Sequence, residues 1–163
     1  MIFATVGSQM AFDRLVQAVD EWAGRQQPVA EVLAQVGQSA YAARHIRTVA
    51  SLTPAEFRRA CAGAEVIVAH AGMGSVLTAL ELGRPMVLLP RRGDRQETRN
   101  DHQLATARWL AARDGVWVAE DEADVGACID QALARRARPT AIEQQASAPL
   151  LDALDRFLRG EAP

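Results

Sequence analysis

The sequence predicts an α/β fold in which helices cover both faces of an open parallel sheet. Short apolar runs of strand length alternate along the chain with segments of helical spacing. Glycines stand where several of the strands give way to helices. Strands that alternate with helices in this way pair in parallel and are covered on both sides. We therefore expect one Rossmann-like domain over residues 1–163.

Four strands are expected in the first half of the chain. They are apolar runs bounded by glycine or polar residues, at residues 2–6, 31–36, 45–50 and 66–69. Between the first two, apolar residues at helical spacing predict a helix: Phe12, Leu15, Val16 and Val19. Thr53 and Glu56 form a capping box around Pro54, which predicts that a second helix begins there.

The second half begins with a glycine turn and a helix between two buried strands. Gly72 and Gly74 lie at the turn after residues 66–69, and Ser75 is expected to open the helix. The helix is expected to bury an apolar face made of Val76, Leu77 and Leu80. It ends before a further buried strand, which is expected at residues 86–89.

The remaining elements are two helices, one strand and a terminal segment. Apolar spacing predicts one helix with Leu104, Ala107, Leu110 and Ala111, and another with Val125, Ile129, Ala132 and Leu133. A strand at residues 116–119 separates them. Residues 135–149 are polar and contain two prolines, which indicates a connector rather than a domain boundary. Residues 150–159 are expected to form a last helix.

The composition argues against several classes of function. The net charge of −2 gives no field that would attract nucleic acid, so none is expected as a partner. All 18 basic residues are arginine, which excludes a lysine Schiff base and a Walker-type lysine. No leader and no apolar run of membrane-spanning length is found, and the two cysteines lie far apart. We therefore expect a cytoplasmic protein.

The turn at residues 72–75 is the strongest candidate for a binding site. A helix N-terminus beside a glycine turn, at the carboxyl edge of a parallel sheet, binds anions through main-chain N–H groups and the helix dipole. If the first and fourth strands are neighbours, the turn after the first strand faces the same crevice, and two such turns fit a diphosphate. The predicted diphosphate-binding residues are Gly7, Ser8, Gly72, Met73, Gly74 and Ser75. The alternative is a tight strand-to-helix junction that binds nothing.

The polar loop at residues 91–103 is a second candidate. Glutamine both donates and accepts hydrogen bonds, which suits the hydroxyls of a sugar. The polar residues singled out in this loop are Glu97, Asn100, Asp101, His102 and Gln103, of which Asn100 or Asp101 could cap the helix that follows. His70 and His102 are weak candidates for a general base, although a core or capping role competes for His70. No pair of carboxylates indicates a bound metal, and the competing interpretation of the loop is a solvated segment.

Four segments together resemble glycosyltransferase family 28, in its carboxyl-terminal, donor-binding half. The segments are TVGSQMAFDRLVQAVDEWA (residues 5–23), AQVGQS (34–39), IVAHAGMGSVLTALELGRPMVLLPR (67–91) and NDHQLATARWL (100–110). The chain is most similar to small stand-alone members of the family. These are the soluble subunit of the eukaryotic two-part N-acetylglucosaminyltransferase and bacterial subunits of exopolysaccharide assembly.

The resemblance implies half of a GT-B fold, a UDP-linked sugar donor, inverting transfer, and no obligatory metal or other cofactor. The two glycine turns would hold the diphosphate, while His102 and Gln103 match the positions that contact the sugar hydroxyls. At the position of Thr78 the family often has a glutamate for the ribose hydroxyls, so Thr78 or Glu97 is expected to substitute.

A complete GT-B enzyme also has an amino-terminal half that binds the acceptor. By resemblance, that half is a separate membrane-associated glycosyltransferase subunit that carries the general base. The acceptor would be a lipid-linked saccharide, and the chain would lie peripherally at the inner face of the membrane through this partner. The expected function is thus the donor-binding subunit of a hexosyltransferase. Two alternatives stay open: a non-catalytic nucleotide-sugar-binding module that regulates a partner, and a self-contained small Rossmann-like enzyme.

Overall fold

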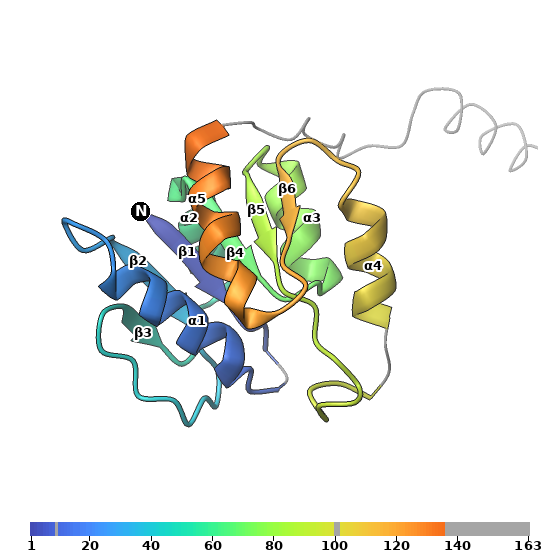
Figure 1. The fold of residues 1–163 in the computed structure, drawn as a ribbon, viewed down its shortest axis with the longest axis horizontal. Helices are drawn as coiled ribbons and strands as arrows, with labels where there is room; N and C mark the ends of the chain where they lie inside the picture. The colour runs from blue at the N-terminus through green and yellow to red at the C-terminus, as the bar shows by residue number, and fades with distance from the viewer. Residues whose placement is uncertain (9, 100–101, 136–163) are drawn as a thin grey trace, which may run out of the picture.

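A computed structural model of the chain describes residues 1–8, 10–99 and 102–135 (Figure 1). The predicted connector at residues 135–149 lies outside this part of the chain, apart from Arg135, which ends the last described helix. The predicted terminal helix at residues 150–159 lies outside it entirely.

The centre of the protein is a sheet of six parallel strands, as predicted. The strands are β1 (Ile2–Thr5), β2 (Val32–Gln35), β3 (Arg47–Val49), β4 (Val66–Ala69), β5 (Met86–Leu88) and β6 (Val116–Val118). They lie in the order β3-β2-β1-β4-β5-β6, and every neighbouring pair is parallel. Strands that are covered on both faces need apolar residues at consecutive positions, and all four residues of β4 are buried.

Helices cover both faces of the sheet (Figure 1). They are α1 (Asp13–Gly24), α2 (Pro54–Gly63), α3 (Met73–Glu81), α4 (His102–Leu110) and α5 (Val125–Arg135), with a short 3-10 helix, η1 (Glu122–Asp124). The helices α1 and α5 form one apolar core with Ile2 and Ala4, while α2, α3 and α4 form a second core with Phe3. Successive strand residues point to opposite faces, so β1 contributes to both cores. None of the described helices is both long enough and apolar enough to cross a membrane.

The start of α2 is fixed by the predicted capping box. The main-chain N–H of Thr53 donates to Glu56 Oε2 at 2.9 Å, and the N–H of Glu56 donates to Thr53 Oγ1 at 3.4 Å. Pro54 at the first helical position has no N–H that would need an acceptor. The loop after β3 therefore enters α2 at a fixed place beside the carboxyl ends of the strands.

The two central strands, β1 and β4, create the opening in which a ligand can bind. They pair directly, with Thr5 opposite Ala69 at their carboxyl ends. From β1 the chain crosses to β2 on one side, and from β4 it crosses to β5 on the other side. The loops that follow these strands therefore diverge. Open α/β sheets bind ligands at such a topological switch point.

Two details of α3 differ from the sequence-based expectation. The helix begins at Met73 rather than Ser75, because Gly72 is the N-cap in an extended conformation (φ −83°, ψ 132°). Gly72 has no capping side chain, so it marks this start less clearly than Ser, Thr, Asp or Asn would. Leu77 was expected in the buried face but is 41% exposed, since successive helix residues differ by about 100° in direction. The buried positions of α3 are Ser75, Val76, Ala79 and Leu80.

Candidate functional site

A cleft of about 740 Å³ opens where the loops after β1 and β4 diverge. Its walls are formed by the loops after β1, β4 and β5 and by the first turns of α2, α3 and α4. Most of the predicted binding residues line it: Gly7, Ser8, Gly72, Met73, Gly74, Ser75, Thr78, Glu97 and Gln103. The structure thus brings both predicted glycine turns and part of the polar loop to one cleft.

The N-terminus of α3 presents main-chain donors to this cleft. The first N–H groups of any helix lack an acceptor within the helix and carry the positive end of its dipole. Gly72 provides no side-chain cap. Among the described residues, none accepts a hydrogen bond from the amides of Met73, Gly74 or Ser75. These three amides are therefore available to an anion.

The space that a side chain at Gly74 would enter is open. A Cβ atom at Gly74 would meet no heavy atom within 4 Å, so the fold does not require glycine at this helical position. Gly7 and Gly72 differ, because a Cβ atom on either would lie 2.6 Å from His70 Cε1 or 2.1 Å from His70 Nε2, respectively. Packing against His70 explains the glycines at 7 and 72, whereas packing gives no reason for the glycine at 74.

The ring of His70 lies close to both glycine turns, at Gly7 and at Gly72. Burial and, second to it, the positive charge of Arg91 lower its pKa to about 4, against the opposing effect of the Thr5 main chain. Nδ1 is buried and has no hydrogen-bond partner among the described residues. The imidazole is therefore neutral at neutral pH. A group with so low a pKa is a weak general base, although it can still exchange hydrogen bonds with a ligand.

The turn after β1 contributes space more than hydrogen-bond donors. Gly7 has a positive φ of 79°, which favours glycine. Its N–H already donates to Thr5 Oγ1 at 3.1 Å, and the same hydroxyl donates to Gln35 Oε1 at 3.4 Å. Ser8 is exposed at the mouth of the cleft.

Gln103 is held with its donor end unused. Its Oε1 accepts the N–H of Arg91 at 3.1 Å, which fixes the amide on the cleft wall. The NH₂ group makes no hydrogen bond to another described residue, so it can donate to a ligand oxygen. This arrangement agrees with the sugar contact predicted for Gln103, which stays a prediction.

The two residues proposed for the ribose are already engaged. Both carboxylate oxygens of Glu97 bind Arg14, from Nε and Nη2, at 2.8 Å each. Glu97 Oε2 also accepts the N–H of Arg92 at 3.0 Å. Thr78 Oγ1 donates to the carbonyl of Gly74 at 2.9 Å. Ribose contacts by Glu97 or Thr78 would have to compete with these bonds.

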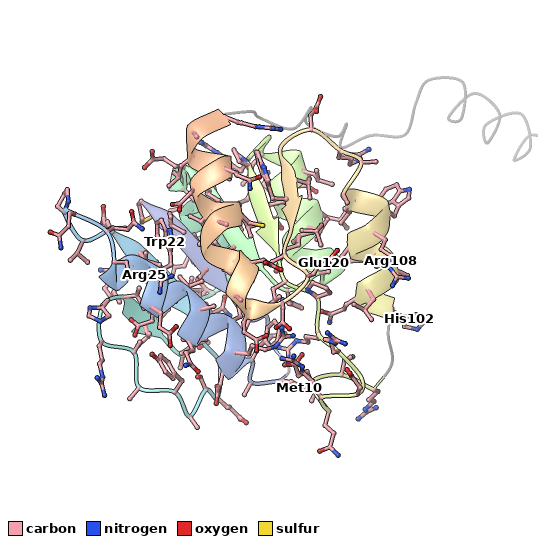
Figure 2. The ribbon with its side chains drawn as sticks, viewed as in Figure 1. Met10, Trp22, Arg25, His102, Arg108 and Glu120 are labelled. Atoms are coloured by element: carbon pink, nitrogen blue, oxygen red, sulfur yellow. The ribbon has the colours of Figure 1, made fainter. Side chains whose placement is uncertain are left out.

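Among the predicted site residues that the structure describes, His102 is not brought to the cleft. His102 begins α4, is exposed, and does not line the cleft, while its neighbour Gln103 does. Figure 2 shows His102 at the start of α4, well apart from Met10 in the loop after β1. Asn100 and Asp101 lie outside the described residues. The sugar contacts predicted for His102 and Asn100 stay predictions, and this conformation does not favour the one at His102.

Sequence reasoning missed two parts of the cleft. Arg91 is buried in its wall, at the point where β5 leads into the polar loop. An arginine directly after a buried strand, at the edge where ligands bind, was the available signal. An apolar wall from Leu52, Pro54 and Phe57 also lines the cleft. It depends on where α2 begins, which the capping box had indicated.

Comparison with solved structures places this fold among glycosyltransferases. Acinetobacter baumannii MurG matches with a TM-score of 0.65 and 17% identity, over 98% of this chain and 52% of that one. ALG13 matches with a TM-score of 0.60 and 17% identity, over 96% and 94%. The glycotransferase of kitacinnamycin matches with a TM-score of 0.60 and 21% identity, over 98% and 39%. The chain thus spans about two fifths of the last protein but nearly all of ALG13.

The family comparison agrees with these structures. No match is found among curated proteins. The profile of the glycosyltransferase family 28 C-terminal domain matches residues 1–156. The fold is the carboxyl-terminal half of a GT-B glycosyltransferase, as the resemblance implied. The chain therefore belongs to glycosyltransferase family 28, as a C-terminal domain of that family.

Proposed function

We propose that this chain is the donor-binding subunit of a heteromeric inverting glycosyltransferase. It would take a sugar from a UDP-sugar and, with a partner, transfer it to a lipid-linked saccharide in polysaccharide or glycolipid assembly. The observation that carries the proposal is the N-terminus of α3, whose three uncapped amides face a cleft that Gly74 leaves open. Family membership supports a nucleotide-sugar as the ligand.

The chemistry of such a transfer fits the residues of the cleft. When the sugar departs, negative charge develops on the UDP diphosphate, and preorganised N–H groups stabilise such charge strongly. The amides of Met73, Gly74 and Ser75 and the dipole of α3 would supply this stabilisation, in place of a metal. The NH₂ group of Gln103 would hold a sugar hydroxyl. The apolar wall formed by Leu52, Pro54 and Phe57 suits a flat base.

A separate partner would supply the acceptor site and the general base. The chain spans 94% of ALG13 but about half of MurG, which supports a protein that provides only one half of a GT-B cleft. His70 lies in the cleft, yet its lowered pKa of about 4 makes it a weak base. In this proposal the chain is cytoplasmic and reaches the inner face of the membrane through its partner.

Two measurements test the proposal. Calorimetry should detect binding of UDP to the chain alone, and Gly74→Val should abolish it in a folded protein. Gly74 is a better site for this test than Ser75. Only 8% of the surface of Ser75 is exposed, so a large residue there would disturb packing. A folded Gly74→Val variant with unchanged UDP affinity would reject the site.

The second measurement is transfer of labelled sugar. The chain is purified with the protein encoded beside it and supplied with labelled UDP-sugars and lipid extract. Transfer by the pair but not by either protein alone supports the proposal. Binding of UDP-sugar without transfer would indicate a regulatory module, and transfer by the chain alone would indicate a self-contained enzyme.

A further inference from the structure

Arg91 is a buried cation in the wall of the cleft, with only 4% of its surface exposed. Its guanidinium donates to four main-chain oxygens. Nη2 binds the carbonyls of Val6 at 2.8 Å and Met10 at 2.6 Å, and Nη1 binds those of Ala11 at 2.8 Å and Glu97 at 3.2 Å. One side chain therefore ties the turn after β1 to the loop after β5.

The charge of Arg91 is not matched by a bound carboxylate. Among the described residues, no carboxylate oxygen accepts from its guanidinium, and the carboxylate of Glu97 binds Arg14 instead. The aromatic ring of Phe12 lies 4.6 Å from the guanidinium carbon. The negative charge of Glu97 acts on Arg91 without a hydrogen bond to its guanidinium, and desolvation by burial still lowers the pKa of Arg91. Carbonyl dipoles and a ring face solvate a cation but do not neutralise it, and a buried charge that is not directly paired is costly.

The positive charge of Arg91 also reaches the space between the glycine turns. It lowers the pKa of His70, whose ring is in contact with the positions of Gly7 and Gly72. Arg91 thus acts electrostatically at the point where the two turns converge, although its hydrogen bonds all go to the main chain behind them.

We propose that Arg91 is a positioning residue of the diphosphate site, and that its charge is the buried counterpart of the bound diphosphate. This inference rests on the proposed function. The guanidinium draws the carbonyls of Val6, Met10 and Ala11 toward itself, so the turn cannot present these oxygens to an anion. Without the guanidinium, the buried carbonyl of Val6 and the part-buried carbonyls of Met10 and Ala11 would lose this donor, and the turn could rearrange toward the cleft.

Binding of three probes separates this role from a general contribution to folding. The probes are UDP, inorganic pyrophosphate and uridine, measured by calorimetry at one salt concentration. Arg91→Met should weaken UDP and pyrophosphate binding by about 10- to 100-fold, as expected for lost interactions with a charged group, and change uridine binding by less than about twofold. Arg91→Lys should recover only part of the loss, because an ammonium keeps the charge but cannot bind four carbonyls.

Arg84→Met is the matched control. Arg84 Nη1 also donates to a main-chain carbonyl, that of Ala64 at 3.3 Å, but Arg84 precedes β5 at the opposite edge of the sheet. This variant should leave the ratio of UDP to uridine affinity unchanged. Its result shows what the loss of an arginine–carbonyl bond does when the bond lies away from the cleft.

Each outcome bears on a different statement. If wild-type protein binds neither UDP nor pyrophosphate, the proposed function fails and this inference fails with it. If wild-type protein binds both and Arg91→Met binds them equally well, or loses uridine in the same proportion, only the inference fails. Should Arg91→Met not fold, Arg91→Lys decides, because pyrophosphate affinity equal to wild type would refute the positioning role.

Discussion

The substitution Gly74→Ala should raise the stability of the protein and lower its affinity for UDP. Gly74 is helical, its φ is not in the positive range, and a Cβ atom there meets no heavy atom within 4 Å. Alanine is favoured over glycine in such a helical position by about 0.5–1 kcal/mol. The free energy of unfolding is therefore expected to rise by up to this amount.

The cost of the same methyl group to binding follows from its position in the cleft. A phosphate oxygen must come within about 2.9 Å of an amide nitrogen to accept its hydrogen bond, whereas it can approach a carbon only to about 3.5 Å. If the methyl group prevents one such bond to the charged diphosphate, the loss is about 1.5–3 kcal/mol. That corresponds to a weakening of UDP binding by about 10- to 150-fold.

Urea denaturation and calorimetry with UDP measure the two effects on the same protein. The control is Gly63→Ala at the end of α2. A Cβ atom at Gly63 would make an ordinary contact, 3.8 Å from Met1 Cε. This position lies beside the start of β1, not beside the carboxyl end where the cleft opens. The substitution should leave UDP affinity unchanged. A Gly74→Ala variant that loses stability, or that keeps wild-type UDP affinity, would refute the assignment of this glycine to binding.

Three further outcomes are expected. His70 stays neutral in the folded chain down to a pH of about 4, whereas in the unfolded chain it is protonated below about pH 6.5. Protonation therefore favours the unfolded chain, and the free energy of unfolding should fall by about 2 kcal/mol between pH 7 and pH 4.5. In urea titrations, the free energy of unfolding of His70→Gln should fall less over this pH range than that of the wild type. An equal fall in both proteins would show that groups other than His70 cause it. Gln103→Glu keeps the acceptor for the N–H of Arg91 but removes the amide donor. Calorimetry should therefore show that binding of UDP-sugar weakens about tenfold relative to binding of UDP. An unchanged ratio of the two affinities would argue against a sugar contact. Transfer by the reconstituted pair should continue in EDTA, and activity lost in EDTA but restored by Mg²⁺ would contradict a metal-free mechanism.

The parts of the fold that sequence predicted best are those set by neighbouring residues. The bounds of β4 were predicted as they are found, because four consecutive apolar residues between polar ones suit a strand buried on both faces. The start of α2 was also predicted, since Thr53 and Glu56 supply the capping bonds within three residues of each other. The pairing of β1 with β4, and thus the convergence of the glycine turns, could only be stated as a condition.

The parts that sequence did not predict depend on contacts between distant residues or on the direction of a side chain. Arg91 binds the carbonyl of Val6, which is 85 residues away, and no local pattern announces such a bond. His102 and Gln103 were assigned together, yet adjacent helix residues point about 100° apart, and only Gln103 lines the cleft. Glu97 was assigned to a ligand without its partner Arg14, because the ion pair joins the polar loop to α1.

The hydrogen bonds around the cleft divide its polar groups in a way that favours an anion. Three acceptors at its walls are already used: the carboxylate of Glu97 by Arg14, Oε1 of Gln103 by Arg91, and the Val6 carbonyl by the same arginine. Four donors at its walls are not used, since the amides of Met73, Gly74 and Ser75 and the Gln103 NH₂ group bind no other described residue. A cation needs acceptors and an anion needs donors. This division of donors and acceptors supports the diphosphate site that we propose, independently of any contact with the base or the sugar.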